Sequence, residues 1–138
     1  MKIKTKRILG AVLATATVMG MAGTTPAYAA SSISGKVNGV SCSGSVKYVK
    51  TPTGVVNGVR ANTYSGGAGS VDVSAIVYYK CMGVKCKHEE KNTGTAGAVS
   101  ATAYTNDSGN VYGGKGKHTV RCGLGTWGEA ITSIGTTW

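Results

Sequence analysis

Hydrophobic and polar side chains alternate along much of the chain, with the period of two residues that is typical of a β-strand buried on one face. In residues 41–49 the polar face holds serines and a lysine, and the opposite face holds Cys42, Gly44, Val46 and Tyr48. The clearest alternation lies in residues 70–81, where one face holds Val71, Val73, Ala75, Val77, Tyr79 and Cys81. We predict strands in both segments and place the second at the centre of a sheet.

Turn residues such as Gly, Pro and Asn separate several further segments with strand character, at residues 55–64, 86–91, 95–105, 111–123 and 124–138. The segment 86–91 is highly charged, which is typical of an edge strand. The last segment is predicted as a strand with Trp127, Glu129 and Ile131 on one face, and a single helical turn is the alternative. No segment has an apolar stripe with helical period. We therefore predict an all-β fold, a small antiparallel β-sandwich of about seven to eight strands.

The N-terminal segment has the features of a secretory signal peptide. Four basic residues among the first seven precede a largely apolar run, and the triplet Ala27-Tyr28-Ala29 supplies the small residues of a cleavage site. We predict that residues 1–29 are removed and that residues 30–138 form a single secreted, extracellular domain. An uncleaved anchor is the alternative, but the apolar run is shorter than the about 20 residues of a membrane span.

Four cysteines fall in the predicted secreted domain: Cys42, Cys81, Cys86 and Cys122. An even number of cysteines in a small exported domain indicates disulfide bonds, and we predict that two of them staple the sandwich. We favour a bond across the 81–86 hairpin and one between Cys42 and Cys122, while crossed pairings stay open. A metal site that uses Cys86 and His88 is the alternative, but no second close pair of ligands follows. We therefore predict no metal.

The predicted mature domain carries 11 basic and 5 acidic side chains, a net charge of +6, which favours an anionic partner outside the cell. Most basic residues fall on predicted polar faces or hairpin ends: Lys47, Lys80, Lys87, Lys91, Lys115, Lys117 and Arg121. If several share one sheet face, they form a basic patch beside Tyr48, Tyr78, Tyr104 and Tyr112. The alternative is a scattered, solvated surface that only keeps the protein soluble.

Residues 113–118, GGKGKH, are similar to a phosphate-binding loop, but the Gly-Lys-Ser/Thr ending and a following helix are missing. We interpret this segment as a flexible basic hairpin tip, where Lys115, Lys117 and Arg121 hold an anionic surface. Trp127 or Trp138 is expected to add an aromatic contact. Trp138 is alternatively a strap that closes the core.

Catalytic chemistry is not expected. His88 and His118 are candidate acid–base groups, but Glu89 and Glu90 are neighbours on a predicted strand and therefore point to opposite faces. The serines have no nucleophile-elbow context. We predict a protein that is not an enzyme, with no catalytic residues and no cofactor, and with no nucleic-acid partner.

The stretch SATAYTNDSGNVYGGKGKHTVRCGLGTWGEAIT, residues 100–132, resembles the C-terminal part of the lactococcin 972 family of small secreted bacteriocins. The matching residues are Ser100, Ala101, Thr102, Asn106, Gly109, Lys117, Thr119, Arg121, Gly125, Trp127, Ala130 and Thr132, with Trp138 as a final aromatic residue. This chain differs from the family in its greater length and its four cysteines. The resemblance implies a β-sandwich toxin that acts on cell-wall synthesis by binding the lipid-linked wall precursor.

Charge, fold and resemblance together predict a secreted cationic protein that binds an anionic component of the cell envelope, either the lipid-linked wall precursor or a wall polymer. We expect it to act as a bacteriocin-like antibacterial without stable insertion into the membrane. The alternative is a secreted protein-binding module, such as a protease inhibitor or a structural component of the extracellular matrix.

Overall fold

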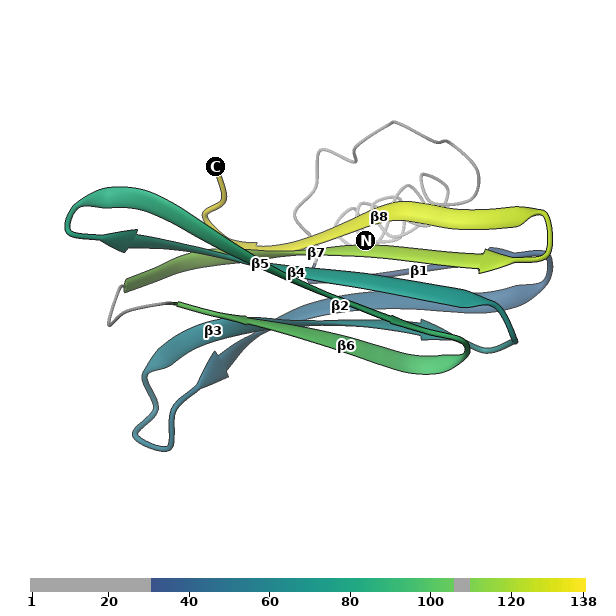
Figure 1. The fold of residues 1–138 in the computed structure, drawn as a ribbon, viewed down its shortest axis with the longest axis horizontal. Helices are drawn as coiled ribbons and strands as arrows, with labels where there is room; N and C mark the ends of the chain where they lie inside the picture. The colour runs from purple at the N-terminus through teal and green to yellow at the C-terminus, as the bar shows by residue number, and fades with distance from the viewer. Residues whose placement is uncertain (1–30, 106–109) are drawn as a thin grey trace, which may run out of the picture.

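The computed structural model of the chain describes residues 31–105 and 110–138 (Figure 1). The predicted signal peptide and two of the residues in the family resemblance, Asn106 and Gly109, lie outside the described residues. The strands are β1 (Ser32–Val37), β2 (Val40–Lys50), β3 (Val56–Ser65), β4 (Ser70–Cys81), β5 (Val84–Gly94), β6 (Gly97–Tyr104), β7 (Asn110–Cys122) and β8 (Gly125–Gly135). Among the described residues there is no helix long and apolar enough to cross a membrane.

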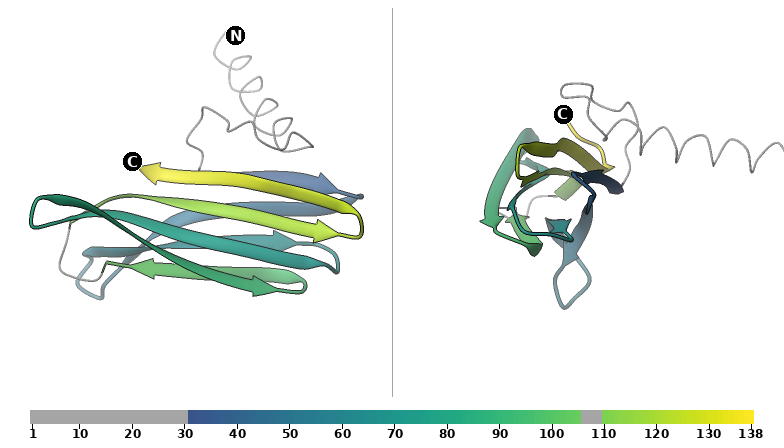
Figure 2. Two further views of the ribbon diagram at one scale, coloured as in Figure 1. Left: turned by 45° about the horizontal axis from the view of Figure 1, so that its top comes forward. Right: turned by 90° about the vertical axis from the view of Figure 1, so that its right-hand side faces the viewer.

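The strands form two four-stranded antiparallel sheets, with the orders β1-β2-β3-β6 and β5-β4-β7-β8. Figure 2 shows the sheets stacked, with the connecting turns at the two ends of the long axis. The prediction of an all-β protein with two antiparallel sheets is confirmed. Strand β4 is central, between β5 and β7, and the charged strand β5 is an edge, as the sequence predicts.

The core lies between the sheets and is built from alternate positions of nearly every strand. Small residues dominate it, and two glycines allow the sheets to approach closely. A Cβ atom at Gly114 would lie 2.4 Å from Cγ2 of Val59, and one at Gly44 would lie 2.4 Å from Cγ of His118. Because side chains at these positions would overlap atoms of the opposite sheet, the glycines are required by packing.

This packing corrects the interpretation of residues 113–118. The segment lies inside β7, hydrogen-bonded to β4 on one side and to β8 on the other, and is not a hairpin tip. Gly114 and Gly116 face the core, whereas Lys115 and Lys117 between them face outward. The glycines therefore reflect close packing between the sheets, and not a flexible loop.

Strand β8 differs from the predicted single face for Trp127, Glu129 and Ile131. The pairing with β7 shifts register between His118 and Val120, so that one additional residue of β8 is inserted there. As a result Trp127 faces the core, where it is 1% exposed, while Glu129 is exposed. The predicted surface contact by Trp127 does not fit this position.

The arrangement of the four cysteines also differs from the predicted disulfide framework. The structure of the described residues contains no disulfide bond, so the predicted two-disulfide framework is not supported by it. The β4–β5 turn holds two residues, and the register places Cys81 opposite Val84 and Cys86 opposite Tyr79. The two cysteines of this hairpin are therefore diagonal neighbours and do not face each other.

Candidate functional site

Most of the basic side chains lie on the outer face of the β5-β4-β7-β8 sheet, which we call the basic face. Alternation along the paired strands brings seven of the 11 basic residues of the predicted mature domain to this face. They are Lys80, Lys85, Lys87, Lys91, Lys115, Lys117 and Arg121. The prediction of a patch is thus supported for all its members except Lys47, which belongs to the other sheet.

One part of the basic face is a shallow polar groove of about 290 Å³, lined by Ser74, Glu89, Lys91, Lys117 and Arg121 among others. The cations here are already paired with carboxylates. Arg121 contacts Asp72, and the ammonium groups of Lys91 and Lys117 each lie 3.9 Å from Oε1 of Glu89.

The carboxylate of Glu89 is held in its charged form within this groove. Ser74 donates a hydrogen bond to it, and this bond, together with the nearby Lys117 and Lys91, lowers its pKa against the opposing effect of burial. The groove is therefore close to internal charge balance, and Lys117 and Arg121 are less available to an external anion than the sequence alone indicates.

The other part of the basic face holds three aromatic rings with three lysines over them, the Lys–aromatic cluster. The ring centroid of Trp138 lies 5.5 Å from that of Tyr78 and 5.9 Å from that of Tyr112. Each ring carries one ammonium group near its centroid: Lys85 at 5.2 Å over Trp138, Lys80 at 5.1 Å over Tyr112 and Lys115 at 5.7 Å over Tyr78. These distances are within the range of cation–π contacts.

Local sequence explains how Trp138 reaches the sheet. The amide of Thr136 donates a hydrogen bond of 2.9 Å to the carbonyl of Tyr112, which extends the β7–β8 ladder. At Gly113 a Cβ atom would lie 2.2 Å from the carbonyl oxygen of Thr136. Glycine at this position lets residues 136–138 lie against β7, so Trp138 covers Tyr78 on the outer face and is not a strap within the core.

Within residues 31–105 and 110–138, no acidic side chain neutralises the lysines of the Lys–aromatic cluster. Lys80 lies directly opposite Lys85 in the β4–β5 pairing, an arrangement of like charges that destabilises a sheet. Among the described residues, Lys80, Lys85 and Lys115 form no ion pair with a carboxylate. The cluster therefore combines uncompensated positive charge with aromatic surface, a combination suited to an anionic ligand.

The five residues predicted for envelope binding are thus divided by the structure. Lys115 and Trp138 belong to the Lys–aromatic cluster, Lys117 and Arg121 belong to the charge-balanced groove, and Trp127 belongs to the core. Sequence reasoning missed Lys85, which was not among the patch residues. A two-residue turn at Met82 and Gly83 places Lys85 directly opposite Lys80. Because Lys80 was expected in the patch, this turn was the signal that could have identified Lys85.

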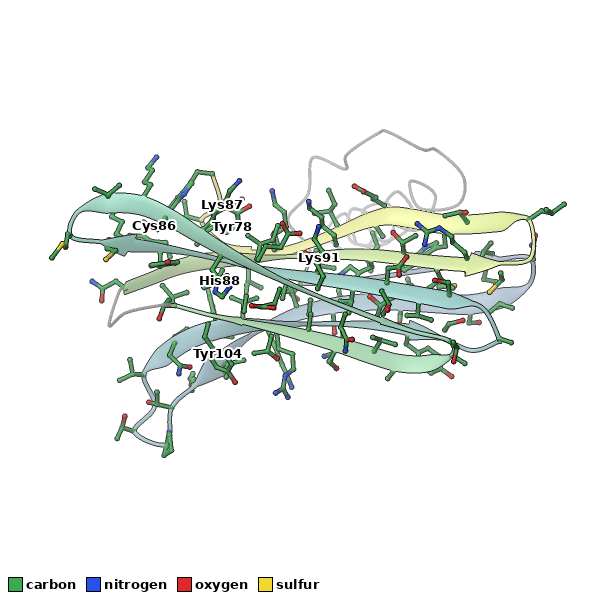
Figure 3. The ribbon with its side chains drawn as sticks, viewed as in Figure 1. Tyr78, Cys86, Lys87, His88, Lys91 and Tyr104 are labelled. Carbon is green, nitrogen blue, oxygen red and sulfur yellow. The ribbon has the colours of Figure 1, made fainter. Side chains whose placement is uncertain are left out.

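Both histidines make hydrogen bonds that hold parts of the fold together. His118 is fully buried, and its Nδ1 and Nε2 atoms each lie 2.8 Å from a hydroxyl oxygen, of Thr63 and Thr132 respectively. Burial lowers the pKa of His118 to about 4. His88 lies between β5 and β6 (Figure 3), with Nδ1 2.8 Å from the carbonyl oxygen of Tyr104. It thereby fastens the two edge strands to each other.

The described residues hold no group of three or more His, Cys, Asp or Glu side chains placed to bind a metal ion. Comparison of the chain with models of protein families, with curated proteins and with solved structures finds no match in any of the three.

Proposed function

We propose that this is a secreted, cationic, non-enzymatic protein that binds an anionic component of the cell envelope through its basic face. The observation that carries the proposal is the Lys–aromatic cluster, where three ammonium groups without an ion-pair partner among the described residues lie over rings that meet at steep angles. Phosphate or carboxylate groups of a ligand would relieve the repulsion between Lys80 and Lys85. The resemblance in residues 100–132 adds the proposal of a bacteriocin-like antibacterial that acts on cell-wall synthesis.

Charge reversal tests this proposal. The double variant Lys80→Glu plus Lys85→Glu is expected to bind isolated bacterial envelopes about 100-fold more weakly at low salt, because each lysine near an anionic surface contributes about 1 kcal/mol and reversal adds repulsion. Killing of an indicator strain should be lost in parallel. Binding is measured by co-sedimentation of the labelled protein.

The matched control is Lys36→Glu plus Lys47→Glu, which changes the net charge equally but on the β1-β2-β3-β6 sheet. It should retain most of the binding. Equal losses for both double variants would show that net charge alone acts, and would contradict a defined site. Binding that is insensitive to salt between low and physiological concentration would favour the alternative, a secreted module for a protein partner.

We further propose that Cys42 and Cys122 form a disulfide bond in the exported protein. Both thiols are buried, on β2 and β7 of opposite sheets. The pKa of the Cys42 thiol is raised by burial and then by the proximity of Cys122. Peptide mapping of protein from the culture medium, alkylated without reduction, should recover the two cysteines in one cross-linked peptide. Recovery of both as alkylated thiols would refute the pairing.

A further inference from the structure

The turn between β4 and β5 exposes apolar side chains at the tip of the molecule. Met82 and Gly83 form the whole turn, and the side chain of Met82 is 100% exposed. Val84, the next residue, is 63% exposed. Figure 1 shows this hairpin extending to one end of the long axis, beyond the neighbouring strands of its sheet.

Met82 is also an unusual residue for this turn. Its φ is 52° and that of Gly83 is 79°, a two-residue turn with both residues in the left-handed region. The β1–β2 turn has nearly the same geometry, with φ of 48° and 78°, and there the residues are Asn38 and Gly39, the pair that such turns favour. A methionine is unfavourable at this positive φ, and its side chain is not buried here. The stability of the fold therefore does not explain why Met82 occupies the turn.

The charged residues that the structure describes next to this turn are all basic. Lys80 and Lys85 face each other next to the turn, and Lys87 follows on the same face. No acidic residue occurs in the sequence between Asp72 and Glu89. The ring of Trp138 lies under the ammonium group of Lys85 and packs against Tyr78, which is further from the turn along β4 than Lys80. The indole ring therefore lies on the side of the lysines away from the apolar tip.

We propose that the β4–β5 tip docks on an anionic lipid bilayer. Met82 and Val84 enter the boundary between head groups and acyl chains, Lys80, Lys85 and Lys87 contact lipid phosphates, and Trp138 lies at the level of the head groups. This order of apolar, cationic and aromatic groups matches the layers of a membrane interface. The contact is peripheral and does not span the bilayer. It rests on the proposed function, because it uses the same lysines and specifies the envelope component as lipid.

The variant Met82→Asn tests the docking because it gives the tip the residue found in the β1–β2 turn, so the fold is retained or stabilised. Binding to vesicles of phosphatidylcholine with about one-third phosphatidylglycerol should fall about tenfold or more, since the apolar contact is lost. Its thermal unfolding temperature should be unchanged or higher. The matched control is Leu124→Asn, a fully exposed apolar residue in the β7–β8 turn at the opposite end, which should bind as the native protein does.

A second measurement separates this inference from the proposed function. The native protein and the Met82→Asn variant should bind a soluble anionic wall polymer, teichoic acid, with equal affinity. Lipids brominated on their acyl chains should quench the fluorescence of Trp138 in the native protein and much less in the variant. Undiminished vesicle binding by Met82→Asn would overturn tip docking but leave the proposed function intact. Failure of the native protein to bind either vesicles or polymer would overturn both.

Discussion

Replacing Trp127 with alanine is expected to lower the free energy of unfolding by about 4 kcal/mol. Trp127 is the largest of the fully buried side chains and lies opposite Val120, with its ring inside a core of mostly small residues. Those neighbours are held in two hydrogen-bonded sheets and cannot collapse into the space. Since a small domain is stable by only about 5–15 kcal/mol, the loss is severe. Urea unfolding monitored by circular dichroism measures it.

The conservative variant Trp127→Phe serves as the control and should lose about 1 kcal/mol or less. Phenylalanine fills most of the volume, and it removes an indole N–H that is buried with no acceptor among the described residues. A Trp127→Ala variant that keeps its stability but loses envelope binding would contradict this account and restore the surface role predicted from sequence.

Acidification from pH 7 to pH 4 is expected to lower the free energy of unfolding by about 3 kcal/mol through His118. Burial lowers its pKa from 6.5 to about 4 in the folded protein. Between these values the unfolded chain binds a proton that the folded protein does not. The stability is therefore fully present above pH 6.5 and is lost as the pH falls toward 4.

The range from pH 7 to pH 5 isolates this effect, and about 2 kcal/mol should be lost there. The lowered pKa of Glu89 adds its own loss only at lower pH. A His88→Gln variant should keep the acid-dependent loss, because His88 lies outside the core, and a folded His118→Gln variant should lack it. Urea unfolding at each pH provides the measurement, and a flat profile from pH 7 to pH 5 in the native protein would contradict the buried, neutral His118.

The strands were predictable because a half-buried strand leaves its period of two in the sequence. The alternation in residues 70–81 identifies β4, and its uninterrupted apolar face correctly indicates a central position. The charges of residues 86–91 correctly indicate an edge. Sequence patterns give the wrong structure where packing between the sheets determines the residue type. The glycines of 113–118 look like loop residues, although they are small because the opposite sheet lies against them.

The sequence allowed most of the residues of the site to be named, but not the way in which they come together. Alternation assigns each lysine to a face of its own strand, but only the pairing register shows that Lys80, Lys85 and Lys115 meet on one sheet. The inserted residue in β8 reversed the predicted face of Trp127, and sequence alternation has no signal for such an insertion. Lys117 and Arg121 are paired with Glu89 and Asp72 through contacts between three strands. The order of residues along the sequence does not show which strands lie side by side.

A titration of the isotopically labelled protein with teichoic acid, followed by nuclear magnetic resonance, would locate the binding surface residue by residue. Amide shifts should change most at residues 78–80, 85–87 and 112–115, together with the indole N–H of Trp138, and the changes should vanish as salt is added. The β1-β2-β3-β6 sheet should be unaffected. Shifts concentrated on that sheet, or spread evenly over both, would contradict a binding surface built on the Lys–aromatic cluster.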